Sequence, residues 1–220
     1  MAVEWIFLDM GYTLVNEDAV WRRRCQEQAD MPEAREKGVT AAQIWAEIEN
    51  ASRACLPQYR TAMEKLCLSH AAPYRSELET LYPDAPGVLR ALRKDYRLGV
   101  IANQLSGLED RLAALGIRPF FSLVVSSWEA GVTKPAPEIF RLALAKAGCK
   151  AENALMAGDR LDNDVFPAKA LGMRTVWVRQ GFGALQTPIS PAYRPDRTVD
   201  SLSALPDAIA SINETRRSAL

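Results

Sequence analysis

Short apolar runs alternate with helix-patterned segments along most of this chain of 220 residues. The runs, which have the length of buried strands, cover residues 3–8, 98–102, 123–126, 154–157 and 175–178. The helical patterns between and before them cover residues 88–94, 107–115, 137–147 and 165–171. Because strands joined by single helices need crossover connections, this order predicts a parallel sheet with helices on both faces. We therefore expect an α/β fold, a Rossmann-like doubly wound parallel sheet.

The segment after the first strand has a different pattern. No convincing strand is found before about residue 80, whereas apolar residues recur at helical spacing. Asp18 is a candidate cap for a first helix and Thr40 for a second, and Pro57 should kink or end the second. The helical pattern continues over residues 58–69. This segment is expected to be a small α-helical domain inserted into the α/β core.

The expected domain limits follow from these two patterns. The core would consist of residues 1–15 and 81–220, and the helical cap of residues 16–80. Turn residues at 83–87 mark the return to the core. After the last strand we expect a loop over residues 187–197, a helix over 202–212 and a frayed end over 213–220.

The composition argues against several kinds of partner. Lys+Arg and Asp+Glu both number 27, so the chain lacks the basic excess that binds nucleic acid. The four cysteines show no C-x-x-C spacing and His70 is the one histidine, so a zinc site is not expected. We expect no signal peptide and no membrane span, which favours a cytoplasmic protein with reduced thiols. The sequence does not indicate the oligomeric state.

Polar residues follow the ends of the predicted strands. Asp9, Asn103 and Asp159 each come directly after or just beyond an apolar run, and Lys134 lies in a loop after another. The carboxyl ends of parallel strands converge on one crevice, where such folds bind ligands. We therefore expect these residues to share one site.

Asp159 and Asp164, with Asp9, would make an oxygen-rich cage of the kind that Mg²⁺ prefers. The alternative is an ordinary acidic loop in which Asp164 caps the next helix. Lys134 lies in a loop with two prolines and could offset the charge of a carboxylate cluster and of a phosphate. Its alternative is a solvated loop lysine.

In order and local context these residues resemble the four motifs of the haloacid dehalogenase (HAD) superfamily, and the segment 16–80 resembles the helical cap of its C1-capped (subfamily I) members. The matching segments are Asp9 with Thr13, residues 100–103, residues 134–140, and Gly158–Asp159 with Asp164. The resemblance covers nearly the whole core, and the third and fourth motifs together are quite specific.

This resemblance implies a hydrolase, most often a phosphatase of a small phosphorylated metabolite. Asp9 would attack phosphorus and form an aspartyl-phosphate that water then hydrolyses. Lys134 would steady this nucleophile and the phosphate, while Thr13 and the second-motif residues Ala102 and Asn103 would hold phosphate oxygens. The resemblance also implies Mg²⁺, held by Asp9, Asp159, the carbonyl of Gly11 and, through water, Asp164.

Two positions depart from the family pattern. Gly11 stands where the family's phosphatases usually carry a second aspartate that protonates the leaving group, a role worth about 10²–10⁴-fold. Its backbone carbonyl remains for the metal. Ala102 stands where Ser or Thr is usual, so Asn103 or a backbone N–H would have to replace one phosphate hydrogen bond.

Other residues could take the missing roles. Tyr12 could reach the cleft, although packing under the cap is favoured, and His70 could replace the acid. One arginine of residues 22–24, next to Trp21, could bind an anionic substrate, but a solvated helix face is favoured for at least two of the three. Trp45 should belong to the core of the cap.

Three other functions stay open. A 2-haloacid dehalogenase tolerates loss of the second aspartate but needs no metal. Phosphonate cleavage would need a Schiff-base lysine from the cap, for which Lys37 and Lys65 are candidates. A phosphate-binding module that lost turnover would explain Gly11 and Ala102.

Overall fold

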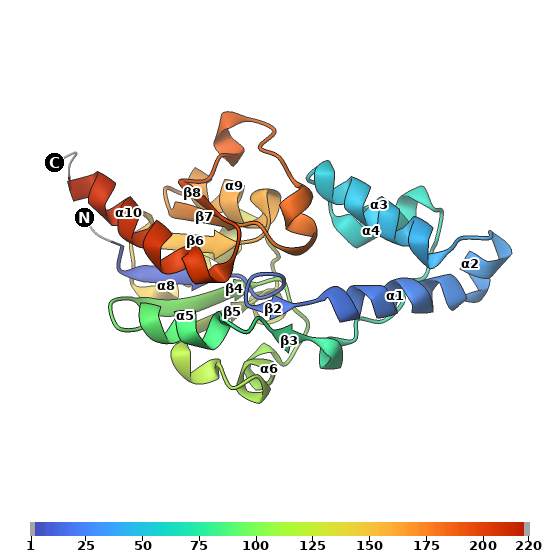
Figure 1. Ribbon diagram of the computed structural model, residues 1–220, viewed down its shortest axis with the longest axis horizontal. Helices are drawn as coiled ribbons and strands as arrows, with labels where there is room; N and C mark the ends of the chain where they lie inside the picture. The colour runs from blue at the N-terminus through green and yellow to red at the C-terminus, as the bar shows by residue number, and fades with distance from the viewer. Residues whose placement is uncertain (1–2, 218–220) are drawn as a thin grey trace.

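The computed structural model describes residues 3–217, and side chains through residue 214. A six-stranded sheet forms one part of the molecule, and helices α1–α4 form a separate group beside it (Figure 1). The strand order is β5-β4-β1-β6-β7-β8 and each neighbouring pair is parallel, as the alternating pattern predicts. The strands are β1 (Trp5–Leu8), β4 (Arg97–Ala102), β5 (Leu123–Ser126), β6 (Ala154–Gly158), β7 (Arg174–Val178) and β8 (Arg197–Val199).

Strand β1 lies in the middle of the sheet and is buried on both faces. Its side chains alternate, so that Ile6 and Leu8 belong to one hydrophobic cluster and Trp5 and Phe7 to another. The chain adds β4 and β5 on one side of β1 and β6 to β8 on the other. This reversal opens a crevice at the carboxyl ends of the central strands.

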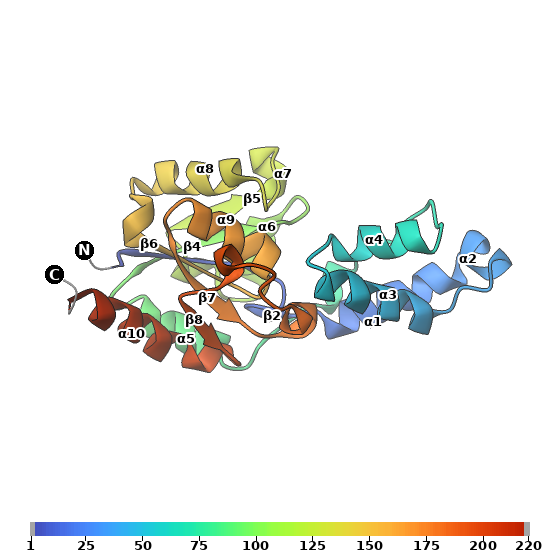
Figure 2. The same cartoon turned by 90° about the horizontal axis from the view of Figure 1, so that it is seen from above.

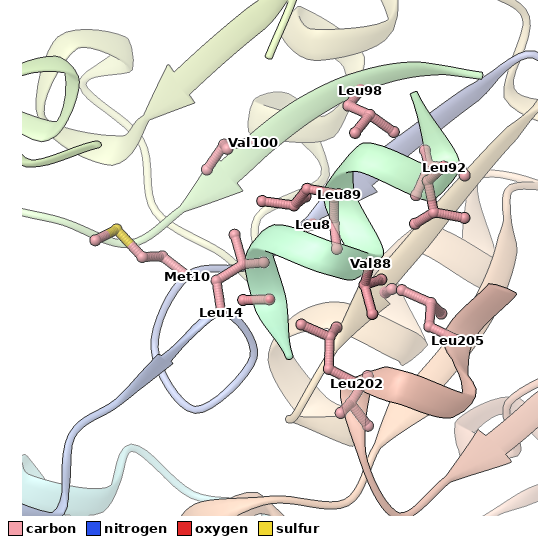
Figure 3. Close-up of a cluster of buried hydrophobic side chains, with 14 of the residues drawn as sticks. Leu8, Met10, Leu14, Val88, Leu89, Leu92, Leu98, Val100, Leu202 and Leu205 are labelled. Atoms are coloured by element: carbon pink, nitrogen blue, oxygen red, sulfur yellow. The ribbon is translucent and has the colours of Figure 1, made fainter. Parts of the chain in front are cut away.

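Helices cover both faces of the sheet. Helices α5 and α10 lie on one side and α8 and α9 on the other (Figure 2). Leucines and valines of α5, β1 and β4 pack with Leu202 and Leu205 in the first cluster (Figure 3). The core helices are α5 (Ala85–Leu92), α6 (Leu108–Ala114), α7 (Ser127–Ala130), α8 (Pro137–Ala147), α9 (Phe166–Ala170) and α10 (Leu205–Arg217).

Helices α1 to α4 lie between two short antiparallel strands, β2 (Val15–Asn16) and β3 (Thr80–Leu81), and this segment is called the insert below. As predicted, Thr40 caps a helix of this segment, α3, and it forms a capping box with Gln43. The helices of the insert are α1 (Asp18–Asp30), α2 (Pro32–Glu36), α3 (Ala41–Arg53) and α4 (Gln58–Lys65).

Several local predictions are wrong. Asp18 is the first residue of α1 rather than its cap, because Oδ1 of Asn16 accepts the Asp18 backbone N–H at 2.8 Å. Helix α5 begins at Ala85, within the predicted turn, since Pro86 suits a first helical turn. Helix α4 ends at Lys65, short of residue 69, because Cys67 adopts a positive φ of 53°.

The C-terminal predictions also need correction. The predicted loop 187–197 contains a 3₁₀ turn at Pro191–Tyr193 and ends in β8. Helix α10 continues through Arg217, beyond the predicted end at 212, and residues 218–220 of the predicted frayed end lie outside the described residues.

Cys25, Cys55, Cys67 and Cys149 are all free thiols. Within residues 3–217, no helix has both the length and the apolar character needed to cross a bilayer.

Candidate active site

The residues after three central strands border one cavity of about 140 Å³. Asp9 follows β1, Asn103 follows β4 and Asp159 follows β6, so adjacent parallel strands deliver them to the same edge of the sheet. Core and insert both line this cavity, through Asp9, Gly11, Tyr12, Glu17, Trp21, Gln58, Asn103, Gln104, Lys134, Asp159, Arg160, Asn163 and Asp164.

Lys134 joins two of the acidic side chains. Its Nζ lies 2.6 Å from Oδ1 of Asp9 and 2.6 Å from Oδ1 of Asp164. The side chain of Lys134 is only 2% exposed, so the predicted alternative of a solvated loop lysine is wrong. An ammonium buried between two carboxylates contributes charge as well as position to the site.

Asp159 completes the acidic group. Asp9, Asp159 and Asp164 each present a carboxylate oxygen, and these three oxygens lie within 4.8 Å of one another. Asp164 comes from a π-helical turn, Leu161–Val165, and its side chain folds back beside Gly158. A Cβ on residue 158 would lie 2.4 Å from Cγ of Asp164, so only glycine allows this approach.

The charges of this group do not balance. Burial, with the carboxylates of Asp164 and Asp9 nearby, raises the pKa of Asp159 well above its usual range. Burial also raises the pKa of Asp164 to about 6, although Lys134 opposes this rise. Burial alone would lower the pKa of Lys134, but Asp164 and Asp9 outweigh it and raise that pKa. Three carboxyl groups therefore lie around one ammonium, and the nearby guanidinium of Arg160 opposes the rise in the pKa of Asp159 without cancelling it.

Such a group suits a hard divalent cation. The ligand atoms are carboxylate oxygens, the donor type that Mg²⁺ takes, and the excess negative charge in a buried place favours a bound cation. Among the residues that the structure describes, this is the one cluster of three or more His, Cys, Asp or Glu side chains with metal-binding spacing. The donor set fits the predicted metal site.

Asn103 holds the loop that carries Lys134. Its Nδ2 donates to the carbonyl of Lys134 at 2.9 Å, and its Oδ1 accepts the Lys134 backbone N–H at 2.7 Å. Both ends of this amide are therefore occupied by the backbone of Lys134. The predicted phosphate contact of Asn103 stays a prediction.

Thr13 and Ala102 lie beside the cavity rather than among its lining residues. Both are fully buried, and Ala102 packs in the first hydrophobic cluster. The hydroxyl of Thr13 has no hydrogen-bond partner among the described residues. Their predicted contacts with phosphate stay predictions.

The space beside Gly11 is filled by another carboxylate. A Cβ on residue 11 would lie 2.3 Å from Oε1 of Glu17 and 2.8 Å from its Cδ. The Glu17 side chain therefore occupies the volume that an aspartate at position 11 would need. Glu17 itself lines the cavity with Asp9.

Glu17 is buried, with 7% exposure, and is held by two aromatic residues of the insert. Nε1 of Trp21 donates to Oε2 at 2.9 Å, and the hydroxyl of Tyr74 lies 2.8 Å from Oε1. Burial raises the pKa of Glu17 to about 7, although the hydrogen bond from Trp21 opposes this rise. Glu17 is not among the predicted site residues. The signal that could have identified it is a carboxyl residue soon after Gly11, where a replacement for the absent aspartate could come from.

The aromatic residues around Glu17 join the insert to the core. The ring of Phe182, from the core, lies 5.8 Å from that of Trp21 and 4.8 Å from that of Trp45. Tyr12 packs edge-on against Phe182 and donates its hydroxyl to Asp18 at 3.0 Å, as the packing prediction favoured. Trp45 therefore lies at the junction of insert and core rather than within the insert alone.

The arginines that open the insert are held by neighbouring side chains. Arg22 and Arg23 are exposed, as favoured, whereas Arg24 stacks 3.7 Å over the ring of Tyr59 and donates to the carbonyl of Ala72 at 3.0 Å. None of the three lines the cavity.

The other candidates from the insert lie away from the cavity. His70 is 79% exposed and 3.8 Å from Glu33, which does not support it as the replacement acid. Lys37 pairs with Glu33 at 3.0 Å and Lys65 with Glu47 at 3.1 Å, so neither supplies the lysine of a phosphonate-cleaving site.

Curated proteins of known activity are similar to part of this chain. Over 124 residues the chain is 38% identical to the phosphoserine phosphatase of Thermus thermophilus, covering 56% of this chain and 48% of that protein. It is 36% identical over 143 residues to the glyceraldehyde 3-phosphate phosphatase of Methanocaldococcus jannaschii, covering 64% and 58%. The chain thus spans about half the length of these relatives.

Solved structures and a family model extend the likeness over most of the chain. The structure of a HAD phosphatase from Thermococcus onnurineus superposes with a TM-score of 0.67 at 22% identity, covering 93% of this chain and 97% of that one, which shows a shared fold. The model of haloacid dehalogenase-like hydrolases matches residues 3–172. With its motifs gathered at one cavity, this chain belongs to the haloacid dehalogenase-like hydrolases.

Proposed function

We propose that this chain is a Mg²⁺-dependent phosphatase of a small phosphorylated metabolite, working through an aspartyl-phosphate on Asp9. The observation that carries this proposal is the buried contact of Lys134 with Asp9 and Asp164 beside Asp159. It combines a carboxylate nucleophile, a fixed positive charge and an acidic group that lacks a full set of counter-charges.

The protein groups divide the work as follows. Asp9 Oδ attacks phosphorus, the bond from phosphorus to the leaving oxygen breaks, and water later hydrolyses the acyl phosphate. Lys134 donates to Asp9 at 2.6 Å, which orients the nucleophile, and it lies where it can face phosphate oxygens. Bound Mg²⁺, held by Asp9, Asp159, the Gly11 carbonyl and Asp164, would neutralise phosphate charge.

The insert supplies the cover of the site. Ser52 Oγ donates to the carbonyl of Phe182 at 2.6 Å, and Arg160 donates to the carbonyl of Leu56 at 3.2 Å, so both contacts join insert to core. Trp21 and Gln58 line the cavity from the insert. We propose that residues 16–80 act as the cap that excludes water and selects substrate.

The relatives favour phosphate esters over the alternatives. The two curated proteins described above are named phosphatases of small phosphorylated compounds. Dehalogenation needs no metal, so it would give Asp159 and Asp164 no metal to bind. A binding module without turnover would not need a lysine paired to Asp9.

A substrate panel tests the proposal. Purified protein is assayed with p-nitrophenyl phosphate, phosphoserine, glyceraldehyde 3-phosphate and a 2-chloro acid, each with Mg²⁺ and with EDTA. We expect phosphate release with Mg²⁺ only, loss of it in Asp9→Asn, and full activity in Asp110→Asn, which changes an exposed aspartate on α6. Chloride release without phosphate release would instead show a dehalogenase, and no turnover of any compound would favour a binding module.

A further inference from the structure

We propose that Glu17 is the acid and base of the reaction, replacing the carboxyl that Gly11 lacks; this rests on the proposed phosphatase function. The carboxyl group of Glu17 occupies the space beside Gly11, since a Cβ there would lie 2.3 Å from Oε1 and 3.1 Å from Oε2. It borders the cavity that contains Asp9. A carboxyl is therefore present where position 11 would deliver one, but it comes from the start of the insert.

The hydrogen bonds around Tyr74 favour a protonated Glu17. The Tyr74 hydroxyl lies 2.8 Å from Oε1 of Glu17 and 2.8 Å from Oε1 of Glu79. One hydroxyl has one proton, so it can donate to only one of these oxygens. Glu79 is ion-paired with Arg111, whereas the described contacts of Glu17 include no cation. If Tyr74 donates to Glu79, its contact with Glu17 is a hydrogen bond only when Glu17 carries a proton and donates it to Tyr74.

The remaining contact of Glu17 fits the same state. Its Oε2 accepts from Nε1 of Trp21 at 2.9 Å, which leaves Oε1 as the atom that carries the proton. Oε1 is also the Glu17 atom nearest to the missing side chain of residue 11. The proton is thus held on the oxygen nearest to the position that a side chain of residue 11 would occupy.

The two chemical steps balance with this group. As the Asp9 oxygen bonds to phosphorus, the electron pair of the breaking bond goes to the leaving oxygen, which takes the proton of Glu17. The Glu17 carboxylate then removes a proton from the attacking water, and the electron pair of the acyl-phosphate bond returns to Asp9. Phosphate leaves and Glu17 again holds a proton.

Other cavity-lining residues do not offer an equivalent proton. The hydroxyl of Tyr12 donates to Asp18, and burial raises the pKa of this phenol further. Asp164 accepts from Lys134 and from the backbone N–H of Arg160. Gln58, Gln104 and Asn163 carry amides, which do not donate protons to a leaving group.

Glu17→Gln tests the role with little disturbance. The amide can donate to Tyr74 through nitrogen and accept from Trp21 through oxygen, which reproduces the bonds of a protonated Glu17. Thermal unfolding should therefore match that of the wild type at pH 6. Glu36→Gln, which makes the same change at an exposed position of α2 outside the cavity, is the matched control.

The readout is the dependence of phosphoryl transfer on the leaving group. With Mg²⁺, p-nitrophenyl, phenyl and ethyl phosphate are compared in the pre-steady state and at steady state. Glu17→Gln should slow transfer from ethyl phosphate by about 10²–10⁴-fold, from phenyl phosphate by less, and from p-nitrophenyl phosphate by less than about tenfold, since p-nitrophenolate leaves without a proton. A burst of p-nitrophenol followed by slow turnover should appear, because the base of the second step is also lost.

A relocation of the carboxyl provides a second test. Gly11→Asp alone should lose activity through its collision with Glu17. Gly11→Asp combined with Glu17→Ser should turn over ethyl phosphate faster than Glu17→Ser alone, because the carboxyl returns from another position. No gain in a folded double variant would contradict the shared role.

The two proposals fail in different ways. If the wild type turns over the esters and Glu17→Gln slows all three equally, or none, the acid role of Glu17 is wrong and the phosphatase function stands. If the wild type turns over none of them and Asp9 is not phosphorylated, the proposed function is wrong and the role of Glu17 is wrong with it.

Discussion

Two buried acidic groups meet at one cavity, and they differ in how their charge is balanced. In the core, Asp9 and Asp164 share the ammonium of Lys134, and Asp159 lies beside them without a contact to it among the described hydrogen bonds. On the side of the insert, Glu17 and Glu79 share the hydroxyl of Tyr74, and Arg111 pairs with Glu79. The first group carries excess negative charge that a divalent cation would balance. The second is balanced if Glu17 keeps one proton.

This difference shows what a buried carboxylate group can be used for. Removing charge from water is costly, so each group must find a cation, a proton or a hydrogen-bond donor. Where the oxygens of three carboxylates face one another, a metal is the better balance. Where a hydroxyl lies between two carboxyls and one of these pairs with arginine, a proton on the other carboxyl is the better balance.

The largest expected effect comes from Lys134→Met. Without its ammonium the carboxylates of Asp9 and Asp164 are buried unpaired, so stability without metal should fall by about 3–5 kcal/mol at pH 8. Urea unfolding in EDTA measures this change. Lys146→Met, on the exposed side of α8, should stay within about 0.5 kcal/mol. An unchanged stability of Lys134→Met would show that Lys134 does not balance the core group.

Addition of Mg²⁺ should have the next largest effect. A ligand that binds only the folded state at 100 times its Kd adds about 2.7 kcal/mol, which appears as a rise in Tm. The rise should disappear in Asp159→Asn combined with Asp164→Asn, because both candidate ligands are removed. An equal rise in that double variant would place the cation elsewhere.

The proton of the second group predicts a dependence of stability on pH. Because the folded pKa of Glu17, about 7, exceeds its ordinary value of 4.5, the folded state keeps a proton that the unfolded state loses between these values. Wild-type stability should therefore fall, relative to Glu17→Gln, by about 2 kcal/mol from pH 5 to pH 7. Unfolding in EDTA at several pH values measures the difference. Parallel curves for the two proteins would show that Glu17 is ionised throughout.

The smallest effect is expected from Thr13→Val. The buried hydroxyl of Thr13 has no partner among the described residues, so an isosteric apolar side chain should leave stability unchanged or raise it by up to about 1 kcal/mol. Phosphate affinity, measured by product inhibition, should fall if the hydroxyl holds phosphate as predicted. Unchanged inhibition would remove Thr13 from the phosphate site.

The core and its metal group were largely predictable. Apolar runs of strand length and the polar residues that end them are local patterns, and the rule for parallel strands then brings Asp9, Asn103 and Asp159 together. Strand β8 was missed because Arg197–Val199 has one fully buried residue and lies after a proline-rich segment. The pairing with β7, rather than local pattern, makes it a strand.

The second group could not be predicted in the same way. Glu17 is separated from Tyr74 and Glu79 by most of the insert, whose helical pattern gives no register between its two ends. The antiparallel pairing of β2 with β3 brings those ends together, and it involves only two residues on each strand. Short pairings leave almost no periodic signal in a sequence.

The position of Glu17, directly before α1, links proton transfer to the docking of the insert. Trp21 and Tyr74, which hold its carboxyl, belong to the same inserted segment as Glu17 itself. A shortened chain in which β2 joins directly to β3 would keep the nucleophile and the metal group but lose the proton donor. Such a chain would release activated leaving groups and fail on alcohols, so the choice of substrate by leaving-group acidity would be a property that the insert adds to the core.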